Sequence, residues 1–124
     1  MKATMRIAPW QDGHASGSTS FQGEERTYWD AEEIYNKMSP FNYADSVSSP
    51  ILLIHGMADD NTGTYPVQSE RFYAALKGNG KTARYVQLPA EAHGYRARES
   101  IGHTLWETVT WLDRFVKGEA TVVP

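Results

Sequence analysis

Two loops in this sequence carry side chains suited to acid–base chemistry. The first, HGMADDNT, contains Asp59, and the second, PAEAHGY, contains His93. A carboxylate that accepts a hydrogen bond from an imidazole holds the ring in one tautomer and stabilises the imidazolium formed when the ring takes a proton. Asp59 and His93 are far apart in the sequence, so this chemistry requires a fold that brings the two loops together.

The pattern of apolar residues predicts the elements that position these loops. Residues 50–55, PILLIH, are almost continuously apolar, which is typical of a parallel strand covered on both faces, and residues 83–88 predict a second strand. Between them, a helix is expected to begin at Pro66 and to end at Gly78. A further helix over residues 101–118 completes the order strand, helix, strand, helix. This α/β order predicts a right-handed βαβ crossover with a helix packed on the sheet.

Loops that follow parallel strands leave the sheet at the same edge, so we expect Asp59 and His93 on one rim. The last predicted helix carries an apolar stripe that should pack against the sheet. Its members are Ile101, Leu105, Val109, Leu112 and Val116, with Trp106, Trp111 and Phe115 as further core or sheet-packing residues.

Composition limits the classes of function. The 124 residues fit one domain, and 12 Lys and Arg against 15 Asp and Glu give a net charge of −3 without any basic run. A negative net charge without a basic run excludes a surface for binding nucleic acid. The sequence has no Cys, and its apolar runs, such as residues 51–54, are too short for a membrane helix. We therefore expect no disulfide, no membrane partner and a cytoplasmic location.

The chain divides into three parts by composition. Residues 1–29 form an irregular lead segment rich in Gly, Ser and Thr, residues 30–118 form the ordered α/β part, and residues 119–124 form a tail.

The α/β part resembles a known family. The segment PILLIHGMADDNTGTYPVQSERFYAALKGNGKTARYVQLPAEAHGYRARESIGHTLWETVTWLDRFV is similar to the carboxyl end of the catalytic domain of the prolyl oligopeptidase family, and most of all to its glutamyl-endopeptidase-like branch. The resemblance implies part of an α/β-hydrolase sheet and a serine peptidase acting on peptide substrates. Asp59 then matches the acid of a Ser-Asp-His triad, and His93 matches its base. The resemblance implies no cofactor.

One part of the family's pattern is missing from this sequence. A nucleophile elbow requires G-x-S-x-G, and the nearest candidate, residues 13–17 (GHASG), has the wrong spacing. In this family the serine precedes the acid and the base. The resemblance therefore implies a C-terminal fragment that carries Asp59 and His93, lacks the serine, and is inactive alone.

Other interpretations of the same residues remain open. Asp59 could instead satisfy loop amides, and Asp60 is its neighbouring alternative. His55 is expected to make structural hydrogen bonds, and without a tight H-x-x-x-H spacing we expect no metal site. Arg96 and Arg98 could recognise an acidic substrate side chain, although surface ion pairing is the favoured interpretation.

Two other functions share these features. An esterase fragment would use the same triad logic. A non-catalytic α/β-hydrolase-like interaction module would keep the fold without the chemistry. A truncated sheet would leave an exposed edge at the apolar strand, and such an edge predicts self-association.

Overall fold

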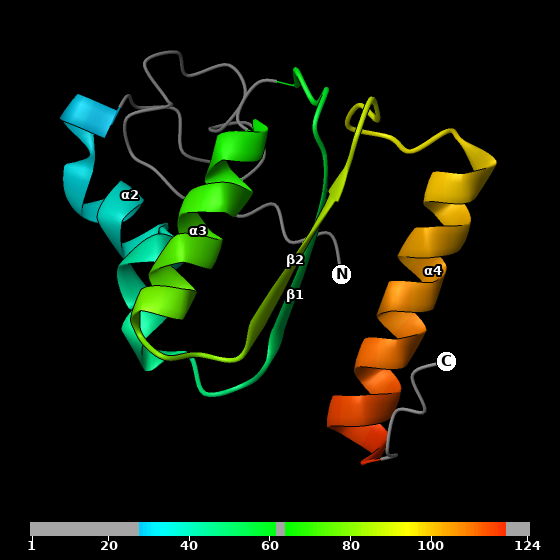
Figure 1. Cartoon of the computed structure of the whole chain (residues 1–124). Helices are drawn as coiled ribbons and strands as arrows, with labels where there is room; N and C mark the ends of the chain where they lie inside the picture. Colours follow the sequence, from blue (N-terminus) through cyan, green and yellow to red (C-terminus); the bar gives the residue numbers. More distant parts are fainter. Residues whose placement is uncertain (1–27, 62–63, 119–124) are drawn as a thin grey trace.

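The computed structural model describes residues 28–61 and 64–118. Within them, two parallel strands, β1 (Ile51–Gly56) and β2 (Ala83–Leu88), pair along their whole length, with Ile51 opposite Ala83 and Gly56 opposite Leu88. Helix α3 (Pro66–Gly78) joins them. The predicted strands near 50–55 and 83–88 and the helix between them are confirmed. The chain therefore contains the expected β-α-β unit (Figure 1).

Three short helical segments precede the sheet. They are the 3-10 helix η2 (Tyr28–Asp30), helix α2 (Glu32–Met38) and the 3-10 helix η3 (Pro40–Ser46). Helix α2 ends at Ser39, which is extended because the residue before a proline is biased away from helical angles. The predicted lead segment 1–29 lies outside the described residues except for its last two positions, and the predicted tail 119–124 lies wholly outside them.

The hydrophobic core lies between α3 and one face of the sheet. Phe72 and Leu76 are one helical turn apart on α3, and both are almost fully buried against Leu53 of β1 and Ala44 of η3. The i,i+4 spacing of the two side chains places both on the face that meets the sheet. Figure 1 shows α2 and α3 on one side of the strands and α4 (Arg98–Leu112) on the other.

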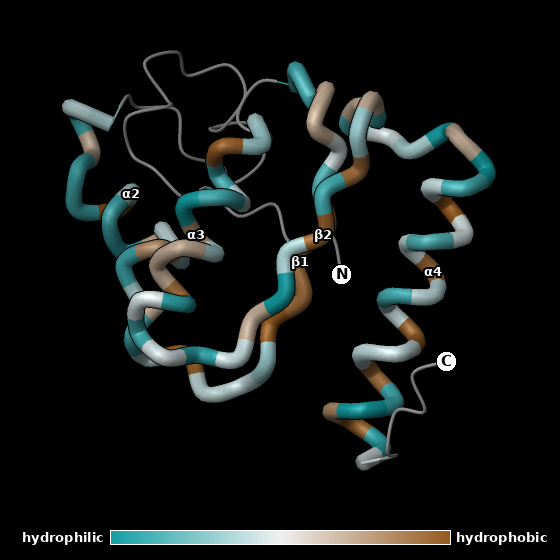
Figure 2. The backbone as a smooth tube through the Cα atoms, viewed as in Figure 1, coloured by the Kyte–Doolittle hydropathy of each residue, from teal (hydrophilic) through white to brown (hydrophobic). Residues whose placement is uncertain are grey.

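Helix α4 corrects one prediction from the sequence. The apolar stripe expected to pack on the sheet is exposed instead, with Leu105 at 64% of its full accessible surface, and Trp106 is also exposed. The hydrophobic bands along α4 are visible in Figure 2. Trp111 and the neighbouring Phe115 are half-buried, with ring centroids 4.4 Å apart.

A polar contact accounts for this orientation of α4. The carboxylate of Glu107, the buried side chain of α4, accepts two hydrogen bonds from the guanidinium of Arg84 on β2, at 2.7 and 2.5 Å. This bidentate pair turns the Glu107 face toward the sheet and the apolar stripe away from it. The helix continues through a π-helical segment, η4 (Asp113–Lys117), and ends at Gly118, whose φ of 74° suits a left-handed helix cap.

No helix among the described residues combines the length and the apolar character needed to cross a lipid bilayer.

Candidate active site

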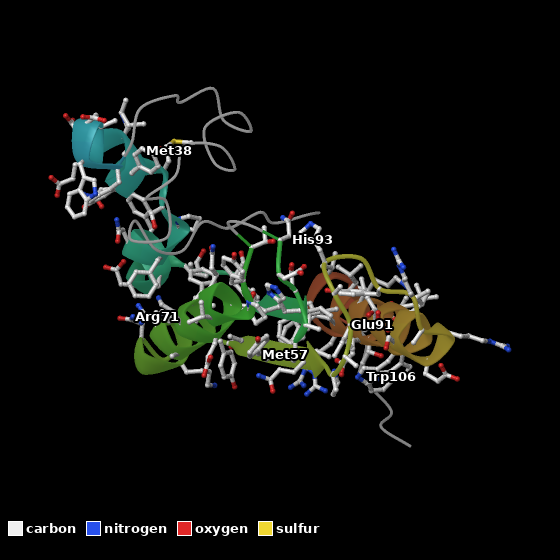
Figure 3. All side chains as sticks on the ribbon, turned by 90° about the horizontal axis from the view of Figure 1, so that it is seen from above. Met38, Met57, Arg71, Glu91, His93 and Trp106 are labelled. Carbon is white, nitrogen blue, oxygen red and sulfur yellow. The ribbon has the colours of Figure 1, made fainter. Side chains whose placement is uncertain are left out.

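The two predicted residues meet at the carboxyl edge of the sheet. Asp59 lies in the loop after β1 and His93 in the loop after β2, and Nδ1 of His93 is 2.9 Å from Oδ2 of Asp59. The parallel register explains the meeting, because both strands end side by side at Gly56 and Leu88. Figure 3 views this edge from above, with Glu91 beside α4 and His93 farther from that helix.

The backbones of the two loops are in direct contact. The amide of Ala58 donates a hydrogen bond to the carbonyl of Glu91 at 2.9 Å, and a Cβ at Gly56 would overlap the carbonyl oxygens of Glu91 and Ala92. Only glycine permits so close an approach at the end of β1. The phenol of Tyr95 adds a hydrogen bond to the carbonyl of Ile54 at 3.0 Å.

Glu91 stabilises the loop that carries His93 through hydrogen bonds within that loop. Its side chain is buried, and its two carboxylate oxygens accept hydrogen bonds from the amides of Arg96 and Ala97, at 2.8 and 3.0 Å. The amide of Arg96 and then the hydroxyl of Ser100 are the main reasons that the pKa of Glu91 is lowered, and burial opposes them. The carboxylate therefore closes the loop that presents His93, just before α4 begins.

The carboxylate of Asp59 is buried and saturated with donors. Its side chain is 3% exposed, Oδ1 accepts the amide of Asn61 at 3.0 Å, and Oδ2 lies 3.1 Å from Nε2 of His55. Burial alone raises the pKa of Asp59, but the hydrogen bonds from His93, Asn61 and His55 outweigh it and leave the pKa lowered. Asp59 is therefore ionised at neutral pH and able to stabilise an imidazolium.

His93 faces both the acid and an open depression. Its side chain is 48% exposed, and Nδ1 lies near Oγ1 of Thr64 (3.1 Å) as well as Asp59. Nε2 takes part in neither contact. The depression has a volume of about 850 Å³ and is lined in part by His93, Asp60 and Arg96. A reacting group in this space would meet a histidine whose other nitrogen is held by a buried carboxylate.

The two predicted arginines are placed differently. Arg96 lines the depression beside His93, whereas Arg98 opens α4, is exposed and is not among the lining residues.

The structural hydrogen bonds expected of His55 are present, since its ring contacts Asp59 at one nitrogen and the hydroxyl of Ser69 at the other. Three contributors were not anticipated from the sequence: Ser69, Thr64 and Glu91. Glu91 and Thr64 each lie in a loop that follows a strand, and that position is a signal the sequence offers, whereas Ser69 lies in α3.

Within residues 28–61 and 64–118, no group of three or more His, Asp and Glu side chains is arranged to hold a metal ion.

A β-α-β unit with an acid after one parallel strand and a histidine after the next places this chain in the α/β-hydrolase class. The model described as "Prolyl oligopeptidase family" matches residues 6–119. The chain belongs to the prolyl oligopeptidase family.

Similarity to named proteins and solved structures is consistent with membership of this family. The chain is 56% identical over 95 residues to the "Probable glutamyl endopeptidase, chloroplastic" of Arabidopsis thaliana, covering 77% of this chain and 10% of that protein. It superimposes on the crystal structure of puromycin hydrolase with a TM-score of 0.76 and 26% identity, covering 98% of this chain and 18% of the other. For the acylaminoacyl peptidase of Pyrococcus horikoshii the TM-score is 0.68 and the identity 27%, covering 95% and 20%. The chain thus spans about a tenth of the Arabidopsis relative and a fifth of the solved chains.

Proposed function

We propose that this chain supplies the acid, Asp59, and the base, His93, of a serine-type peptidase that hydrolyses peptide bonds through a Ser-Asp-His triad. The observation that carries the proposal is the 2.9 Å contact between the buried Asp59 carboxylate and His93 at the sheet edge. Family membership supports it, because the named relatives include a probable endopeptidase and a peptidase.

On this proposal each nitrogen of His93 has its own role. With Asp59 ionised, Nδ1 carries the proton and donates it in a hydrogen bond to Oδ2, so Nε2 is the unprotonated nitrogen. Nε2 then accepts the proton of a serine hydroxyl as that hydroxyl attacks a peptide carbonyl, and returns it to the leaving amine. Asp59 stays ionised and stabilises the imidazolium between these two transfers.

The proposal also concerns the source of the nucleophilic serine. The 124 residues contain no G-x-S-x-G motif, so the serine would come from a polypeptide segment outside them. On this proposal the 124-residue chain alone does not hydrolyse peptides. An assembly of the chain with a segment carrying the serine does.

Arg96 is the better placed of the two predicted arginines for recognising an acidic substrate side chain. It lines the depression beside His93, where a substrate residue would lie, and a guanidinium binds a carboxylate through paired hydrogen bonds. Arg98 would act only at the edge of such a site. On this proposal, Arg96→Gln lowers kcat/KM about 10-fold or more for peptides with an acidic residue, and much less for neutral peptides.

The test joins this chain to a polypeptide segment that carries a G-x-S-x-G serine and measures peptide hydrolysis. We expect Asp59→Ala and His93→Ala each to lower kcat by about 10⁴-fold or more, as for comparable triads. His103→Ala, on an exposed part of α4, is the matched control and should keep full activity. Full activity in both site variants would overturn the proposal. Hydrolysis of esters but not peptides would identify an esterase instead.

A further inference from the structure

We propose that His55, held in place by Ser69, is a positioning residue that fixes the carboxylate of Asp59 beneath His93. The acid is thereby shared between two imidazoles that approach it from different elements. The catalytic meaning of this arrangement rests on the function proposed above, but the arrangement itself is a property of this chain.

A continuous line of contacts supports the proposal. Oγ of Ser69, in the first part of α3, is 2.7 Å from Nδ1 of His55, and Nε2 of His55 is 3.1 Å from Oδ2 of Asp59. The same oxygen is 2.9 Å from Nδ1 of His93. The line therefore ties helix α3 and strand β1 to both loops of the site.

The chemistry of the partners determines the direction of each hydrogen bond. An ionised carboxylate only accepts, so Nε2 of His55 must carry a proton that it donates to Oδ2 of Asp59. In a neutral ring, Nδ1 is then an acceptor, and the hydroxyl of Ser69 donates to it. Ser69 thus selects the His55 tautomer that can hold the acid.

His55 is suited to support rather than to proton transfer. Its side chain is 13% exposed, both ring nitrogens are engaged, and it is not among the residues that line the depression. His93 is half exposed and does line it. A second donor on Oδ2 restricts rotation of the carboxylate, whose Oδ1 is held by the amide of Asn61. The acid is then held ready when His93 takes a proton.

The ionisable groups around the acid come from strand β1 and from the loop after β2. They are His55 on β1, His93 on the second loop, and the phenol of Tyr95 farther along that loop. The pKa of Tyr95 is raised by burial and then by the charge of Asp59. The hydrogen bond from His55 is one of the contributions that keep the pKa of Asp59 low.

The test uses the full 124-residue chain, labelled with ¹³C and ¹⁵N, and NMR of its side chains. Imidazole nitrogen shifts should show His55 as the Nε2–H tautomer and His93 as the Nδ1–H tautomer. His55→Phe should raise the pKa of Asp59, measured on its carboxyl carbon, and reduce the Nδ1–H fraction of His93. His55→Gln, whose amide can still donate, should reverse part of both changes, and Ser69→Ala should convert His55 to a mixture of tautomers.

His103→Phe is the matched control and should change neither the Asp59 titration nor the His93 tautomer. An Nδ1–H tautomer of His55 in the unaltered chain would overturn the proposal. So would an unchanged Asp59 titration in His55→Phe with the amide spectrum of the fold retained. If His55→Phe loses the folded amide spectrum, Ser69→Ala and His55→Gln decide the question by the same readouts. Failed peptide hydrolysis with these NMR changes present would reject the proposed function alone.

Discussion

Two adjacent aspartates follow β1, and their surroundings give them different properties. Asp59 is buried with its oxygens engaged by His55, His93 and Asn61, whereas Asp60 is exposed and lines the depression. The chemical type of the two residues is the same, so the difference arises from the turn that directs one carboxylate inward. A buried carboxylate with several donors stays ionised and fixed, which is what an acid that orients a histidine requires.

Glu91 provides the first prediction at the level of single residues. Replacing Glu91 by Gln removes one acceptor from the amides of Arg96 and Ala97, so the loop that carries His93 should open more often. We expect hydrogen exchange of these two amides to become about tenfold faster. Glu99→Gln, an exposed position in the first turn of α4, is the control and should leave their exchange unchanged. Equal exchange in both variants would contradict the role assigned to Glu91.

The lowered pKa of Glu91 adds a pH dependence to this prediction. A carboxylate whose pKa is lower in the folded chain stabilises the fold above its ordinary value, here 4.5, and the effect is lost as pH falls through the folded pKa. Amide protection in the loop should therefore be constant above pH 4.5 and decrease below it. In Glu91→Gln this decrease should be smaller, because the titrating group is gone.

At the scale of elements, the close contact between the end of β1 and the loop that carries His93 requires glycine at position 56. Gly56→Ala should destabilise the chain by about 2 kcal/mol or more, because the new methyl group meets backbone carbonyls that cannot move independently. Gly102→Ala is the matched control. Its Cβ would meet nothing within 4 Å, and it should stabilise α4 by about 0.5 to 1 kcal/mol. Urea unfolding of both variants measures the difference, and a neutral Gly56→Ala would contradict the close packing of the two loops.

The attachment of α4 to the sheet depends on the Arg84–Glu107 pair. Glu107 is 4% exposed at its side chain, and Arg84 is 52% exposed. Glu107→Gln should therefore cost about 1 to 3 kcal/mol, less than a fully buried pair would, because Arg84 remains partly solvated. The pair of Asp113 and the exposed Lys117 gives the control, since Lys117→Ala should cost less than about 0.5 kcal/mol. Equal unfolding free energies for the two variants would show that the pair does not hold the helix.

At the scale of the whole molecule, the main feature of the described residues is exposed apolar surface together with the edges of the sheet. The described residues form a sheet of two strands, each with an outer edge that no other described strand covers, and α4 exposes its apolar stripe. Such edges and faces favour association with other chains. The self-association predicted from the sequence stays a prediction.

Sedimentation of the isolated chain measures this association. We expect the 124-residue chain to form dimers or larger species, and Leu105→Glu to shift the distribution toward monomer, because a charge on the exposed stripe disfavours contact between copies. Lys117→Ala, at an exposed polar position, is the control. A chain that stays monomeric at high concentration would contradict the prediction. A monodisperse oligomer without peptidase activity in the joined enzyme would favour the interaction module.

The sequence alone determined the order of elements, both strands, the helix between them and the shared rim of Asp59 and His93. These features follow from local apolar periodicity and from the rule that parallel strands end at one edge. Only the tertiary structure decided how α4 is turned, because its orientation depends on a pairing between Arg84 and Glu107 that no local pattern encodes. The same holds for the line from Ser69 through His55 to Asp59, since hydrogen bonds between separate elements appear only when the chain is packed.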